Sequence, residues 1–103
     1  MFGTVAKMTF KPGAFEKMQE LMKQQEDRQA KGFVFTNVLR SKDDPNEVWL
    51  IVGFEDEASY RANADDPETN KMAESYQPLM AAPPEWHDGE FVSMMQAGAK
   101  TTA

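Results

Sequence analysis

The sequence predicts an α+β domain of ferredoxin-like architecture, with elements in the order βαββαβ and a four-stranded antiparallel sheet that carries its helices on one face. Three observations lead to this fold class. Strand-like and helix-like segments alternate, so two halves of nearly equal length each read strand, helix, strand. The halves also share a faint similarity between TFKPGAFEKM and GFEDEASYRA. Finally, one strand in the middle of the chain is apolar on both faces.

This strand, expected over 47–54, reads EVWLIVGF. Val48 and Leu50 point to one side of it, and Trp49 and Ile51 point to the other. A strand with one face in water carries polar residues at alternate positions. The segment is therefore expected in the interior of the sheet, with both faces covered.

The first half begins with an alternating strand over 1–10, which Pro12 ends. A helix is expected over 14–30, with Gly13 as its N-cap and Gly32 as the residue that stops it. Apolar residues at helical spacing form the stripe that packs on the sheet: Phe15, Met18, Leu21 and Met22.

The second strand is expected over 33–40, FVFTNVLR, followed by a polar hairpin loop. Simple alternation places Phe33, Phe35 and Leu39 on one face, with Asn37 among them. Burying an unpaired amide costs roughly 1–3 kcal/mol. Asn37 is therefore expected to contact ligand or backbone if it faces the helices, and to have no special role if it lies near an edge.

In the second half, a helix is expected over 56–64 and a further helical piece begins at Asp66 and Pro67, a good N-cap followed by a good first helical residue. Pro78 ends that piece.

The last strand is expected over 86–95, with a bulge or bend at 88–89. Residues 1–95 are expected to form a single domain, and residues 96–103 a flexible C-terminal tail.

The helices of this fold cover only one face of the sheet. Leaving Val5, Trp49 and Ile51 in water on the other face would forfeit roughly 1.5–3 kcal/mol for each large side chain. A partner sheet removes this cost, so the sequence predicts a two-fold homodimer that packs sheet against sheet.

Composition excludes several classes of function. The net charge of −6 and the pI near 4.7 argue against nucleic acid and anionic membranes as partners. The chain has no cysteine, no apolar run long enough to span a bilayer, and no signal-peptide pattern at its start. We expect a cytoplasmic protein without a bound metal, because one histidine with surface carboxylates is a weak ligand set. No cofactor is expected either, as the resemblance described next implies.

The segment VGFEDEASYRANADDPETNKM, together with the central strand before it, resembles the antibiotic-biosynthesis-monooxygenase-like family of the dimeric α/β-barrel superfamily. This resemblance implies a barrel-shaped dimer with a pocket between helices and sheet. It also implies cofactor-independent oxidation of a small aromatic, polyketide or quinol-type molecule.

The same resemblance leaves an alternative open. Positions where many members carry histidine read Asn63 and roughly Asn70 here, which suits a non-catalytic dimeric module that binds a small hydrophobic ligand or acts in a stress response. The residues that the haem-degrading branch needs fall near Ala6, Asn63 and 73–74 and do not match, so haem degradation is disfavoured.

His87 is the only histidine, and its ordinary pKa near neutrality suits a general base that deprotonates a phenol or enol. The alternative is that His87 faces solvent and has no catalytic role. Tyr60, Met72 and Tyr76 lie near the family's pocket position, with helix-to-sheet packing as their alternative role. The predicted catalytic residues are His87, Tyr60 and Asn63, and the predicted substrate-binding residues are Asn37, Trp49, Met72 and Tyr76.

Overall fold

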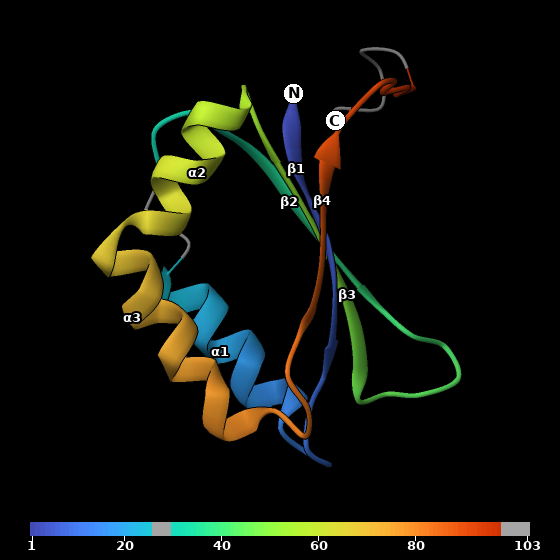
Figure 1. Cartoon of the computed structure of the whole chain (residues 1–103). Helices are drawn as coiled ribbons and strands as arrows, with labels where there is room; N and C mark the ends of the chain where they lie inside the picture. Colours follow the sequence, from blue (N-terminus) through green and yellow to red (C-terminus); the bar gives the residue numbers. More distant parts are fainter. Residues whose placement is uncertain (26–29, 98–103) are drawn as a thin grey trace.

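A computed structural model of the chain describes residues 1–25 and 30–97, and it confirms a four-stranded antiparallel sheet with its helices on one side (Figure 1). The strands lie in the order β2-β3-β1-β4 across the sheet. The elements are β1 (Phe2–Thr9), α1 (Phe15–Gln25), β2 (Phe33–Arg40), β3 (Glu47–Phe54), α2 (Glu57–Asp65), α3 (Pro67–Tyr76), the 3₁₀ turn η1 (Gln77–Leu79) and β4 (Glu85–Glu90).

The apolar strand β3 lies inside the sheet, as its sequence predicts, and pairs with β1 on one side and β2 on the other. Because side chains alternate along a strand, cross-strand partners share a face. Ala6 and its β3 partner Leu50 face the helices, whereas Val5 and its partner Ile51 face away from them. We call the side without helices the open face.

The helix-facing side of the sheet contains the hydrophobic core of the described residues. Ala6 and Val48 are 0% and 1% exposed, and Phe10, Phe15 and Met18 join Val48 in one buried cluster. Phe15, Met18 and Met22 of the predicted apolar stripe of α1 therefore belong to or pack against this core.

A bulge in β2 overturns the expected face of Phe33. Phe33 pairs with Phe54, but the next partners are Phe35 and Gly53, so Val34 is an extra residue in the ladder. Phe33 consequently joins the helix-facing side, where its ring lies 5.8 Å from that of Phe54, while Phe35 lies on the open face. The Phe35 ring occupies the space above Gly53 that a side chain there would fill.

Both predicted starts in the second half are confirmed. The Asp56 side chain accepts a hydrogen bond from the Ser59 N–H (2.8 Å) and caps α2, and Asp66 accepts from the Glu68 N–H (2.9 Å) and caps α3. Pro67 is the first residue of α3.

The predicted N-cap of α1 is wrong by one residue, because α1 begins at Phe15 and Gly13 lies in the preceding turn with φ +80°. The expected end of this helix near residue 30 includes residues 26–29, which lie outside the described part of the chain.

β4 is shorter than expected and has no bulge at 88–89. Its register with β1 runs without interruption from Lys7–Glu85 to Phe2–Glu90. One backbone hydrogen bond continues past this register, from the Phe91 N–H to the Met1 carbonyl (2.9 Å), and the chain then begins, so residues 91–97 have no regular secondary structure. Of the predicted tail, residues 98–103 lie outside the description. Within the described residues, every helix is too short or too polar to traverse a bilayer.

Two glycines at positive φ differ in their surroundings and allow a matched test. Gly13 (φ +80°) has open space where a Cβ would lie, whereas at Gly32 (φ +82°) a Cβ would collide with the Ser59 side chain. Gly13→Ala is expected to lower the free energy of unfolding by about 1 kcal/mol through backbone strain alone. Gly32→Ala should lower it further, as measured by urea denaturation. Equal losses would show that Ser59 moves aside without cost.

Candidate functional site

Two hollows in the described part of the chain lie on opposite sides of the sheet. The first, a cavity of about 80 Å³, lies between the helices and the sheet; we call it the helix-side cavity. The second, a shallow groove of about 230 Å³, lies along β1 and β4; we call it the open-face groove.

Methionine dominates the wall of the helix-side cavity. Its lining residues are Met8, Met18, Met22, Val38, Val48, Leu50 and Tyr76. Typical ligand pockets measure about 300–1,000 Å³, so the cavity as it stands holds only a small part of an aromatic ligand. Methionine side chains are flexible and change rotamer readily. A ligand would therefore enter by displacing methionines rather than by filling a preformed space.

Tyr76 supplies the only hydroxyl among these seven lining residues. Burial raises the pKa of the Tyr76 hydroxyl above its ordinary value of 10.0, because the phenolate loses solvation in apolar surroundings. Tyr76 thus stays protonated at neutral pH. It can donate a hydrogen bond inside the cavity but does not act as a base there.

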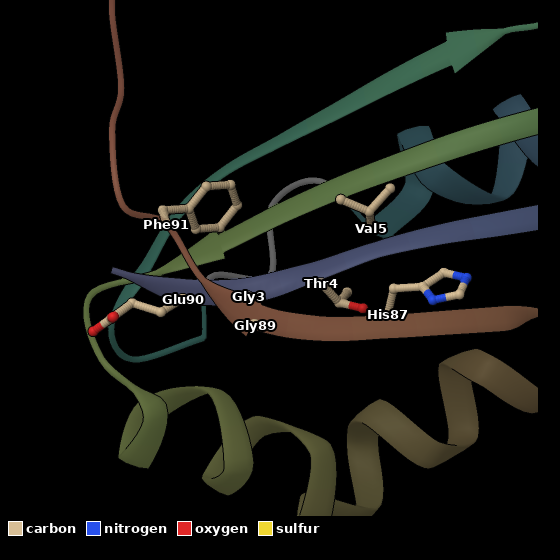
Figure 2. A pocket seen from close by; sticks show the side chains of 7 residues that line it. All are labelled: Gly3, Thr4, Val5, His87, Gly89, Glu90 and Phe91. Carbon is tan, nitrogen blue, oxygen red and sulfur yellow. The ribbon is translucent and has the colours of Figure 1, made fainter.

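The open-face groove has a glycine floor and one aromatic wall. In Figure 2, Gly3 and Gly89 lie side by side on β1 and β4, and Val5, Phe91 and His87 extend on the side away from the helices. Phe91 packs edge-on against Phe35, with ring centres 5.5 Å apart. His87 is exposed and pairs with Val5 across the strands.

Tyr60 joins α2 to the edge strand β4. Its hydroxyl donates a hydrogen bond to Asp88 Oδ1 (2.8 Å), and its ring packs against Phe2 and Phe54 at 5.2 and 5.7 Å. Burial is the main cause that raises the pKa of Tyr60, and the bond to Asp88 adds to it.

Thr4 lies beneath this contact and is 2% exposed. Among the described residues, the Thr4 hydroxyl makes no hydrogen bond of normal geometry. It nevertheless lies close to the Tyr60 hydroxyl and acts to lower the pKa of Tyr60, against the rise caused by burial and Asp88. Tyr60, Asp88 and Thr4 therefore form a polar cluster from α2, β4 and β1.

Asn63 and Met72 accept hydrogen bonds at the junction between α2 and α3 and within α3. Asn63 Oδ1 accepts a hydrogen bond from the Thr69 hydroxyl (3.0 Å), and its backbone carbonyl accepts from the Asp66 N–H (3.2 Å). Met72 is half-buried on α3, and its carbonyl accepts from Ser75 Oγ (2.5 Å). Neither side chain lines the helix-side cavity.

The structure divides the predicted site residues between the two faces. Asn37 pairs with Ile51, Trp49 with Lys7, and His87 with Val5, so all three lie on the open face. Tyr60, Asn63, Met72 and Tyr76 belong to the helix layer. The sheet separates the two groups within one chain.

Sequence reasoning missed three features of these sites. Asp88, the partner of Tyr60, was expected only as part of a bend. The positions of Met8, Met18 and Met22 around one cavity were not foreseen, although the eight methionines of the chain were a usable sign. Arg40, whose guanidinium carbon lies 4.0 Å from the centre of the Phe15 ring, had no sequence signal.

Comparisons with known proteins agree with this geometry. The family model described as antibiotic biosynthesis monooxygenase matches residues 1–75. A comparison with curated proteins gave no match.

Several solved structures share the fold. SnoaB from Streptomyces nogalater, a cofactor-independent oxygenase, is 18% identical with a TM-score of 0.79, over 93% of this chain and 97% of that one. Rv0793 from Mycobacterium tuberculosis is 13% identical with a TM-score of 0.75, over 92% and 98% of the two chains. A conserved protein from Methanosarcina mazei is 17% identical with a TM-score of 0.75, over 85% and 89%. At these identities the likeness establishes the fold alone.

The Tyr60–Asp88 bond should be visible in the pH dependence of stability. Because folding raises the pKa of Tyr60 above 10.0, its contribution is complete below pH 10.0 and is lost as the pH rises through the folded-state pKa. Tyr60→Phe is expected to cost about 1 kcal/mol at neutral pH, and its deficit relative to wild type should shrink above pH 10.0. Urea denaturation across this range measures the effect.

Asp88→Asn is the matched control, because it keeps an acceptor oxygen and removes the charge. The tyrosinate absorbance of this variant should appear at lower pH than in wild type. A Tyr60→Phe deficit that does not change with pH would contradict the assignment.

Proposed function

The chain belongs to the antibiotic biosynthesis monooxygenase family, and on that premise we propose that it is a cofactor-independent oxygenase of a small aromatic molecule of the polyketide or quinol type. The observation that carries this proposal is the helix-side cavity, which is apolar and has one hydroxyl, that of Tyr76. An apolar slot with one orienting donor suits a phenol-like ring.

In the proposed chemistry the substrate itself supplies the electrons, so the protein needs no redox cofactor. The substrate loses a proton to solvent, and its carbanion binds O₂ and is oxidised to a peroxide. The peroxide takes up a proton and loses water to leave a carbonyl, while the protein orients the ring and shields the intermediate. The methionine wall excludes water from the cavity. The neutral Tyr76 hydroxyl donates to a substrate oxygen and stabilises negative charge as it develops there.

Tyr60, Asn63 and His87 keep their predicted catalytic roles as part of this proposal. Tyr60 and Asn63 do not line the helix-side cavity, so their roles call for a substrate that extends beyond it. His87 lies across the sheet from the helix-side cavity, so a role for it calls for a substrate in the open-face groove instead.

Oxygen uptake tests the proposal. With an anthrone or a hydroquinone as the substrate, the protein is expected to consume O₂ faster than the uncatalysed reaction. Tyr76→Phe should reduce the rate by roughly 10²-fold if its hydroxyl stabilises the developing oxyanion. Lys71→Gln, an exposed change on the same helix, serves as the matched control and should leave the rate unchanged.

The variants Tyr60→Phe, Asn63→Ala and His87→Ala separate the remaining roles. Loss of turnover in His87→Ala alone would move the site to the open-face groove. Absence of O₂ uptake in wild type with either substrate class would contradict the oxygenase.

A specific observation favours a second candidate, a dimeric module that binds a small molecule without turning it over. None of the seven residues that line the helix-side cavity titrates near neutral pH. Such a module would be stabilised against heat by an aromatic ligand while showing no O₂ uptake.

We further propose that the chain forms a homodimer through its open face. Val5 and Leu39 are 37% and 61% exposed on this face, and Trp49 and Ile51 lie between them. Water against this surface would be costly, and large apolar patches mark interaction sites.

Light scattering after gel filtration should therefore give twice the monomer mass. Leu39→Glu should give a monomer, because the substitution places a charge in the apolar interface. Trp86→Gln is the control, since Trp86 is also exposed but shares the helix-facing side with its partner Ala6. A monomeric wild type would contradict the proposal.

A further inference from the structure

We infer that Arg40 makes the helix-side cavity selective for aromatic ligands that carry one anionic group, either a carboxylate or an ionised phenol or enol. This inference rests on the proposed function in one respect, because it takes the helix-side cavity as the ligand site. It adds the charge of the ligand and the residue that recognises it.

Arg40 lies at the rim of the cavity, as three independent positions show. It is the last residue of β2, and its partner across the strands, Val48, lines the cavity. Val38, two residues earlier on the same face of β2, also lines it. On the helix side, the guanidinium lies over the ring of Phe15, one turn before the lining residue Met18.

Two contacts orient the exposed Arg40 guanidinium. Arg40 Nε donates a hydrogen bond to the carbonyl of Pro45 (2.9 Å), and the guanidinium carbon lies 4.0 Å from the Phe15 ring centre. These contacts use one of the five N–H donors and one face of the plane. The terminal nitrogens are the pair that binds a carboxylate in a bidentate manner.

The charge of Arg40 is not neutralised within the described part of the chain. The salt bridges there pair Lys7 with Glu47, Lys17 with Glu20 and Arg61 with Glu57, and Arg40 takes part in none of them. The chain has a net charge of −6 and 17 acidic residues, yet among the described residues no carboxylate pairs with this exposed arginine. Its chemistry complements an anion at the cavity rim.

A packing role is the competing explanation, because arginine stems often cover apolar surface. In that role Arg40 would shield Phe15 and stabilise the fold without selecting ligands. The two roles differ in a measurable way, since only ligand recognition makes affinity depend on the charge of the ligand.

The test compares benzoate with benzyl alcohol, which have the same ring and differ in charge. Binding is followed through the methyl NMR signals of isotope-labelled methionine, because Met8, Met18 and Met22 line the cavity. Wild type is expected to bind benzoate more tightly, and added salt should weaken that preference. Arg40→Gln should weaken benzoate binding by roughly tenfold and leave benzyl alcohol binding unchanged.

Arg61→Gln is the matched control, since Arg61 is paired with Glu57 on α2, and it should keep the preference for benzoate. Equal affinity for both probes in wild type, or an equal loss of both in Arg40→Gln, would overturn the inference and leave the ligand site standing. Failure of both probes to perturb the methionines that line the cavity in wild type would overturn the ligand site itself, and the inference with it.

Discussion

The pairing of β3 with β1 is the constraint on which the rest of this molecule depends. Both strands are interior, and β3 is apolar on both faces, so two separate layers must cover it. The helices cover one face through the core around Phe10, Phe15 and Val48. The chain supplies nothing comparable for the other face within its described residues. A single strand thus determines the helix layer, the cavity beneath it and the open face.

The alternation of side chains along these strands also decides which chemistry can meet. Neighbouring residues on β4, His87 and Asp88, face opposite sides of the sheet, so Asp88 bonds Tyr60 while His87 lines the open-face groove. A shift of one residue would exchange their roles. The bulge at Val34 has this effect on β2, where it separates Phe33 from Phe35. Side-chain function here is therefore a matter of register more than of residue type.

The same reasoning explains what sequence can and cannot predict for this chain. The first three strands, the start of α2 near Asp56 and the cap at Asp66 follow from local pattern and were predicted. The bulge in β2 and the end of β4 at Glu90 depend on a partner strand distant in sequence, so no local pattern contains them. Of the site, the helix positions of Tyr60 and Tyr76 were predictable. The contacts of Arg40 and Asp88 arise only when strands, loop and helices come together.

The apolar wall of the helix-side cavity and the polar groups in and around it contribute differently to ligand binding. A wall of methionine adapts to many shapes, and an apolar surface discriminates weakly between ligands of similar size. Selectivity must then come from polar groups, because a ligand that leaves a buried donor or acceptor unpaired loses binding free energy. Tyr76 inside the cavity and Arg40 at its rim are the groups in position to provide it. Arg40 is held by a backbone carbonyl and a ring rather than by a carboxylate. No carboxylate among the described residues pairs with Arg40, so its charge stays available to a ligand, whereas Arg61 is already paired with Glu57.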